Sequence, residues 1–108
     1  MTEQGDTYKD THNRSNRDFA RFRAIIHGKV HGVSFGYQTQ RRAVELGVDG
    51  WVRNLDDGTV EIDAEGEHPS LDTLVGFLQQ GPTGADVTRV DLNWLEPLRA
   101  DGGFSIQY

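Results

Sequence analysis

The sequence has no cysteine, only two lysines and no long hydrophobic run. Without thiols, the protein can have no disulfide, thiol nucleophile or thiolate zinc site. Every apolar stretch is far shorter than the roughly 20 residues of a membrane-spanning helix, and the N-terminal residues lack the basic, then apolar, pattern of a secretory signal. We therefore expect a cytoplasmic protein that does not contact a membrane.

Positive charge is also scarce. The chain has 11 Lys and Arg against 17 Asp and Glu, which gives a formal net charge of −6. Nucleic acids and anionic membranes bind to basic surfaces, so we expect neither as a partner. An anionic ligand would have to be held by a few local groups.

The 108 residues, 35% of them hydrophobic, are enough for one domain with a single two-layer core. Residues 1–18 are almost wholly polar and have no apolar periodicity, so burial cannot offset the entropy lost on ordering them. We predict a disordered polar tail over residues 1–18 and one folded domain over residues 19–108.

Within that domain, strand-like and helical patterns alternate. The expected elements are a strand over 21–30, a helix over 35–46, strands over 48–54 and 59–65, a helix from about 69 to 80, a strand around 90–94 and a short strand over 104–108. Gly47 and Gly81 mark the helix ends, and Asp57-Gly58 marks a hairpin. This order predicts an α+β fold of the ferredoxin-like, split βαβ type (βαββαβ), with two helices on one face of an antiparallel sheet.

The strongest candidate for a functional site is the turn from the first strand into the first helix, GKVHGVSFG over residues 28–36. A turn that contains Gly28 and Gly32 leaves backbone N–H groups unpaired at the positive end of the helix dipole, which favours an anion such as phosphate. Such a turn can equally be a tight connection that binds nothing, and these residues alone leave both interpretations open.

Four segments together carry a recognisable family pattern: GKVHGVSF (28–35), LGVDGWVRN (46–54), DGTVE (57–61) and FSIQY (104–108). From about Phe22 to Tyr108 the chain resembles the acylphosphatases. The resemblance implies a small cytosolic hydrolase that splits a carboxyl–phosphate mixed anhydride into carboxylate and phosphate without a metal or other cofactor. We expect a monomer whose ligands are a small acyl phosphate or inorganic phosphate.

The resemblance also assigns roles to residues. The phosphate-binding loop is His31, Gly32, Val33, Ser34 and Phe35, and the residue that positions the attacking water is Asn54. An Arg that clamps the phosphoryl oxygens is expected after the Phe of the loop, but this chain has Gly36 there. The loop is therefore only part of the expected catalytic site.

No nearby residue is a natural substitute for that Arg. Arg41 and Arg42 lie about 140° and 240° round a helix from Gly36, and Gln40 shares its face but is neutral. Arg53 and Lys29 each precede a site position, so their side chains are expected to point elsewhere. Arg14 and Arg17 of the tail have no support as replacements.

We therefore expect an acylphosphatase of very low activity, because an arginine clamp contributes roughly 10³–10⁵ in rate. The alternative is a non-catalytic phosphate-binding or regulatory module on the same fold. Gly36 favours the module, whereas Asn54 favours the enzyme, since a pure binding module has no use for a water-positioning amide. RNA recognition is remote, because the chain lacks a basic patch and paired aromatic strand motifs.

Other polar and aromatic residues have simpler explanations. His27 and His31 have no third metal ligand nearby, so we expect a structural or solvent-facing role for His27 and only a small charge effect from His31. Turn chemistry explains the Asp56-Asp57 pair without a catalytic role. We expect Trp51 and Trp94 to lie in the core under the helices or on the rim of the site.

Overall fold

The computed structural model describes residues 18–99 and 102–108. Its elements are β1 (Phe19–Lys29), α3 (Phe35–Leu46), β2 (Asp49–Asn54), β3 (Val60–Glu67), α4 (His68–Gln80), β4 (Asp86–Leu95) and β5 (Phe104–Gln107). Apart from Asp18, the predicted polar tail lies outside the described residues. Neither described helix has the length and apolar character needed to cross a bilayer.

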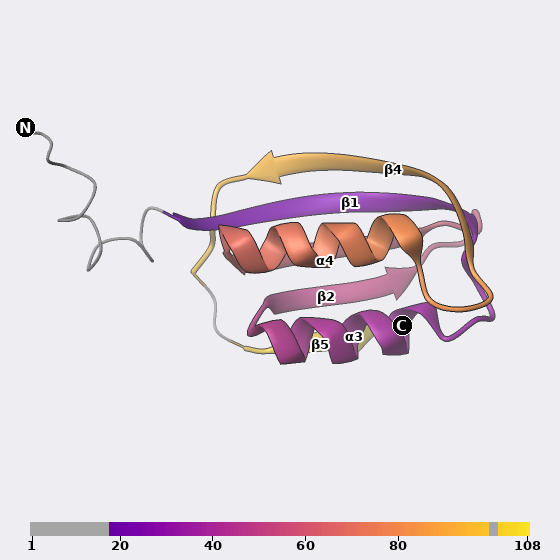
Figure 1. The fold of residues 1–108 in the computed structure, drawn as a ribbon, viewed down its shortest axis with the longest axis horizontal. Helices are drawn as coiled ribbons and strands as arrows, with labels where there is room; N and C mark the ends of the chain where they lie inside the picture. The colour runs from indigo at the N-terminus through magenta and orange to yellow at the C-terminus, as the bar shows by residue number, and fades with distance from the viewer. Residues whose placement is uncertain (1–17, 100–101) are drawn as a thin grey trace, which may run out of the picture.

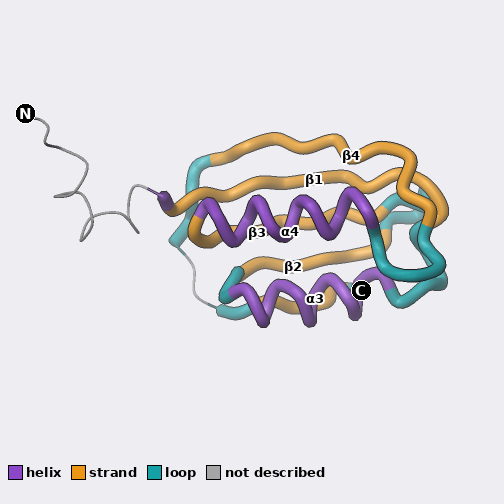
Figure 2. Tube along the Cα trace, viewed as in Figure 1, coloured by secondary structure: helices purple, strands orange, loops and turns teal. Residues whose placement is uncertain are grey.

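The five strands form one sheet in the order β4-β1-β3-β2-β5. The first four pair antiparallel, whereas β5 pairs parallel with β2 at the edge of the sheet. Figures 1 and 2 show α3 and α4 side by side on one face of the sheet. The predicted ferredoxin-like fold is confirmed, and the parallel strand β5 makes the sheet mixed.

The core lies between the helices and the sheet, and its residues follow the expected periods. Alternate strand residues and one stripe of each helix are buried; they include Phe22, Ala24, Ile26, Val52, Val60, Ile62, Ala64, Phe35, Thr39, Ala43, Leu71, Leu74 and Leu78. Burying this apolar surface is the main force that holds the helices on the sheet. It also fixes the start of α3 above β2 and β5.

The hairpin between β2 and β3 has the turn chemistry expected of its sequence. The backbone N–H and the hydroxyl of Thr59 both donate to Asp57 Oδ1, at 3.0 and 2.6 Å. These bonds lower the pKa of the Asp57 carboxyl. Gly58 adopts a φ of 93°, which suits glycine. Asp57 therefore has the structural role that its position predicts.

The two tryptophans lie on opposite faces of the sheet. Trp94 faces the helices, 5.6 Å edge-to-face from Phe22 and stacked 4.6 Å from His68. It is nevertheless 46% exposed on the edge strand β4 and does not line the cavity at the start of α3, so it lies neither in the core nor on the rim of the site, contrary to the prediction. The prediction for Trp51 is wrong: its ring lies on the open face, beside the Arg23 guanidinium at 5.4 Å. The reason is strand alternation, because Val52 takes the buried inward position of β2 and its neighbour must point the other way.

Candidate active site

The connection between β1 and α3 is an irregular loop with unused hydrogen-bond donors. Gly32 and Ser34 both have left-handed backbone angles, with φ of 75° and 60°. Ser34 is the N-cap of α3, yet its side chain makes no capping bond. Within residues 18–99 and 102–108, no hydrogen bond uses the N–H groups of Gly32, Val33, Ser34 or Phe35. These donors and the helix dipole are therefore available to an anion.

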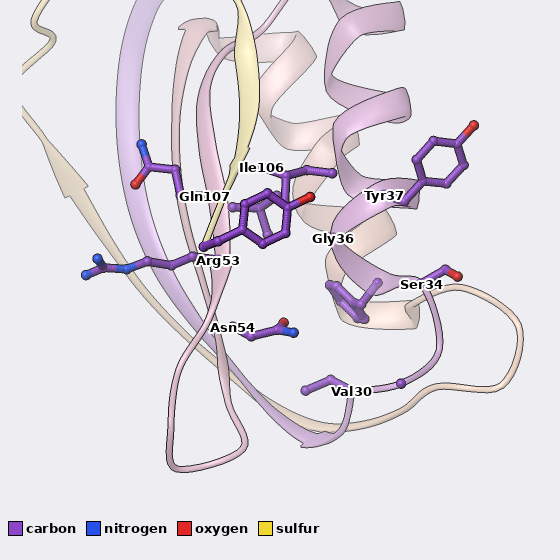
Figure 3. A pocket seen from close by; sticks show the side chains of 12 residues that line it. Val30, Ser34, Gly36, Tyr37, Arg53, Asn54, Ile106 and Gln107 are labelled. Carbon is purple, nitrogen blue, oxygen red and sulfur yellow. The ribbon is translucent and has the colours of Figure 1, made fainter.

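The loop opens into a cavity of about 270 Å³ where the ends of three elements meet (Figure 3). The loop and the first turn of α3 form one wall, and the last residues of β2 and β5 form the other. The lining residues are Val30, Gly32, Ser34, Phe35, Gly36, Tyr37, Val52, Arg53, Asn54, Ile106, Gln107 and Tyr108. A ligand in this cavity would contact the free N–H groups and the ends of both strands together.

Asn54 is the last residue of β2 and is exposed. Figure 3 shows its side chain directed into the cavity, towards the loop. In the described part of the chain, its amide has no hydrogen-bond partner. The amide is therefore free to hold a water molecule or a ligand oxygen opposite the loop.

Gly36 lies in the first turn of α3, between the loop and the two strand ends. Its backbone is helical, so its conformation does not require glycine. A Cβ atom at this position would lie 3.8 Å from Val52 Cγ1 and 3.9 Å from Ile106 Cγ2, which are ordinary van der Waals contacts. The fold therefore accepts a side chain here, and glycine leaves this part of the cavity open.

Comparison with known proteins agrees with this geometry. The family model described as acylphosphatase matches residues 22–106. The chain belongs to the acylphosphatase family. An acylphosphatase of Thermococcus kodakarensis is 49% identical over 71% of this chain and 85% of its own length.

Solved structures show the same relationship. The structure of an acylphosphatase from Bacillus subtilis is 37% identical, with a TM-score of 0.79 over 82% of this chain and 99% of that one. One from Coxiella burnetii is 31% identical, with a TM-score of 0.81 over 87% of this chain and 98% of that one. The hydrolase fold of this family is therefore shared along the whole described domain.

The predicted site residues of the family pattern are only partly on the cavity wall. Gly32, Ser34, Phe35, Gly36 and Asn54 line the cavity together. The other two loop residues, His31 and Val33, are not among the lining residues. The His31 ring donates from Nε2 to the carbonyl oxygen of Thr59 at 2.8 Å, and so links the loop to the β2–β3 hairpin. Val33 packs against the core.

The arginine on the cavity wall is directed away from the cavity. Arg53 contributes to the cavity wall, but Figure 3 shows its guanidinium pointing outwards. The guanidinium pairs with Glu61 at 2.8 Å and lies 5.1 Å from the centre of the Trp51 ring. Arg53 therefore cannot replace a clamping Arg in this arrangement.

The two arginines and the glutamine of α3 are also engaged elsewhere. Arg41 lies 6.0 Å from the ring of Tyr37, and Arg42 lies 5.2 Å from the ring of Phe77. The amide of Gln40 donates to the carbonyl oxygen of Phe104 at 3.1 Å and ties the helix to β5. None of these three residues lines the cavity.

The contribution of β5 to the cavity is not predicted from the sequence. In the parallel register Val52 faces Ile106 and Arg53 faces Gln107, so the end of β5 runs beside Asn54. Ile106, Gln107 and Tyr108 therefore line the cavity, together with Tyr37 of α3. The alternation of β5 predicts a strand but carries no signal for the strand with which it pairs.

The histidine pair does not form a metal site. His27 Nε2 lies 2.9 Å from Asp91 Oδ2 and 3.2 Å from Arg89 Nη2, on the far side of the sheet from the helices. The bond to His27 lowers the pKa of Asp91. Among the described residues, no three His, Asp or Glu side chains are grouped to hold a metal ion.

Proposed function

We propose that this protein hydrolyses acyl phosphates and that the absence of a cation at position 36 makes the reaction slow. The observation that carries the proposal is the cavity itself. The loop, whose backbone N–H groups have no partner among the described residues, lines it together with Gly36 and the free amide of Asn54. This is the arrangement needed to hold a phosphoryl group on one side and a water molecule on the other.

The proposed reaction is an in-line displacement at phosphorus. The water oxygen held by Asn54 forms a bond to phosphorus as the bond from phosphorus to the acyl oxygen breaks, and the proton of the water passes to the phosphate or to solvent. The leaving group is a carboxylate with a pKa near 4, so no general acid is required. Catalysis then depends on placement and on neutralising the charge of the phosphoryl oxygens.

The loop can supply only part of that neutralisation. Backbone N–H groups are preorganised dipoles, and removing one preorganised donor typically costs about 10²–10³ in rate. A guanidinium contributes a full charge and is worth roughly 10³–10⁵ at a transferring phosphoryl group. With glycine at position 36, we expect hydrolysis above the uncatalysed rate but far below that of a site with the arginine.

A non-catalytic phosphate-binding or regulatory module is the alternative. Gly36 is the observation that favours it, because a site without a charge clamp can still bind an anion. Asn54 favours the hydrolase, because its unpartnered amide faces the loop where binding alone would not need it.

Hydrolysis of benzoyl phosphate by the parent protein, Gly36→Arg and Gly36→Leu decides between these functions. We expect kcat/KM to rise at least about 10²-fold in Gly36→Arg, because the guanidinium completes the cradle. Gly36→Leu adds bulk without charge and should give no rise. A folded Gly36→Arg protein that binds phosphate but hydrolyses no faster than the parent would overturn the hydrolase and leave the binding module.

The same variant has a distinct signature in stability. Replacing glycine in a helix gains about 0.5–1 kcal/mol, whereas a cation in the first turn opposes the helix dipole by about 0.3–1 kcal/mol. Without ligand, Gly36→Arg should therefore unfold in urea at nearly the same concentration as the parent. Added phosphate should stabilise Gly36→Arg more than the parent, because tighter binding shifts unfolding further.

A further inference from the structure

We propose that the part of the cavity beside Gly36 binds a small organic cation, a guanidinium or ammonium group supplied by the ligand, next to a phosphoryl group in the loop. This inference rests on the proposed function and adds a substrate class to it. Here the cation site is defined by Gly36, Val52, Ile106 and Tyr108.

The shape of the cation site comes from the missing side chain. At position 36 a Cβ would meet only methyl groups of Val52 and Ile106, at 3.8 and 3.9 Å. The cavity continues from this point to Gly32 of the loop and to Tyr108 at the end of β5. A planar group lying over these methyl groups would therefore be in the same cavity as an anion on the loop.

The charge of the site favours a cation from outside. An anion on the loop would meet backbone dipoles and no guanidinium from Arg41, Arg42 or Arg53, because these three side chains are directed elsewhere. A charge-assisted pair between a guanidinium and a phosphoryl group is about twice as strong as a neutral hydrogen bond. The ligand that matches the cavity best therefore carries a negative phosphoryl group and a positive guanidinium or ammonium group.

An aromatic ring at the cavity adds a second attraction for a cation. Tyr37 and Tyr108 both line it. Arg41 already lies against the ring of Tyr37, but in the described part of the chain no cation lies against Tyr108. The faces of aromatic rings attract guanidinium and ammonium groups. The ring of Tyr108, which is fully exposed, therefore provides a free aromatic surface at the rim of the cavity.

Two sources could supply the cation. It could be a free guanidinium ion that binds together with the substrate, or it could be part of the acyl group, as in an acyl phosphate that carries an ammonium or guanidinium group. The first experiment uses the free ion. Millimolar guanidinium chloride should accelerate benzoyl phosphate hydrolysis by the parent about tenfold or more, and the effect should saturate.

Three controls make this experiment specific. Urea has the same planar shape without charge and should give no acceleration, and sodium chloride at equal ionic strength should give none either. Gly36→Leu fills the cation site with an apolar side chain and should not respond to guanidinium. Equal effects of guanidinium and urea, or an equal gain in Gly36→Leu, would overturn the cation site.

The second experiment tests the substrate as the source. It compares kcat/KM for an acyl phosphate with an ammonium group in its acyl part and for a neutral analogue of the same size. The parent should prefer the cationic substrate about tenfold, and Gly36→Arg should lose or reverse that preference because like charges repel. Acceleration by guanidinium without this preference assigns the site to free cations. Absence of both effects overturns the proposal.

A binding measurement separates this inference from the proposed function. Amide chemical shifts of Gly36 and Tyr108 in the phosphate-loaded parent should respond to guanidinium but not to urea. If Gly36→Arg is active and guanidinium neither shifts these signals nor accelerates hydrolysis in the parent, the cation site is overturned and the proposed hydrolase function stands. If Gly36→Arg is inactive, the proposed hydrolase fails, and the shifts still report whether the cation binds.

Discussion

The open face of the sheet and the cavity differ sharply in charge. On the open face, Arg21 and Arg23 both donate to Asp63 at 2.9 Å, and Arg53 pairs with Glu61. In the cavity, the described residues offer backbone dipoles and the Asn54 amide, with no inward-pointing cation. The arginines of the sheet therefore pair with carboxylates. No described arginine points into the cavity that would hold an anion.

Strand alternation explains how neighbours can differ so much. Arg53 and Asn54 are adjacent in β2, but successive side chains of a strand point to opposite faces. Asn54 is therefore directed into the cavity, and Arg53 lies with Trp51 on the open face. Proximity in the sequence therefore does not bring the charge of Arg53 into the cavity, whereas a side chain at position 36 would fit there with ordinary van der Waals contacts.

The largest expected effect is a loss of catalysis without a loss of phosphate binding, caused by a substitution at Asn54. In the Gly36→Arg background, Asn54→Ala should lower kcat by about 10²–10³, because the attacking water loses its holder. Phosphate affinity, measured by isothermal titration calorimetry, should change little, because the loop and Arg still hold the anion. Asn93→Ala, which removes an exposed amide of β4, is the matched control. A large loss of phosphate affinity in Asn54→Ala would assign Asn54 to phosphate binding instead.

A substitution on the open face of the sheet is expected to have a smaller effect, and to change stability without changing hydrolysis. Burial acts to raise the pKa of Asp63, but hydrogen bonds from Arg21 and Arg23 outweigh it and lower that pKa. Asp63→Asn removes the charge partner of two arginines and should lower the free energy of unfolding by about 2–4 kcal/mol at neutral pH. Hydrolysis at saturating substrate should not change, because Asp63 does not line the cavity.

The pH dependence of unfolding tests the same ion pair. Because the folded pKa of Asp63 is depressed, its contribution to stability is present above the unfolded value near 3.9 and is lost as pH falls through the folded pKa. Urea titrations should therefore show a flatter acid dependence for Asp63→Asn than for the parent. Parallel curves for the two proteins would contradict this role, and Asp91→Asn, at an exposed pair, should have a much smaller effect.

Most of the fold follows from local patterns in the sequence. The spacing of Phe35, Thr39 and Ala43 predicts the buried stripe of α3, and Gly47 predicts its end in a left-handed conformation. The alternation of Val60 and Ile62 predicts the inward face of β3. These signals depend on residues a few positions apart, which is why they can be read without a structure.

The parts that could not be predicted depend on distant contacts. The start of β4 at Asp86 has no apolar alternation and results from pairing with Lys29 beyond an irregularity in β1. The parallel partner of β5, and hence the place of Tyr108 at the cavity, is a choice between strands far apart in the sequence. The resemblance to the family identified the loop, Gly36 and Asn54 as site positions. The free space beside Gly36 could not be predicted, because it depends on how β2 and β5 pack against α3.

The smallest expected effect is also the most direct test of the difference between the two regions. In the Gly36→Arg background, Arg53→Gln should leave hydrolysis of benzoyl phosphate within about twofold, because its guanidinium points away from the cavity. It should lower the free energy of unfolding by at most about 1 kcal/mol, since a half-exposed ion pair with Glu61 contributes little. Glu61→Gln, which breaks the same pair from the other side, is the matched control. If Arg53→Gln lost about tenfold in kcat while Glu61→Gln did not, Arg53 would have to turn into the cavity during the reaction, and the separation of the two faces would fail.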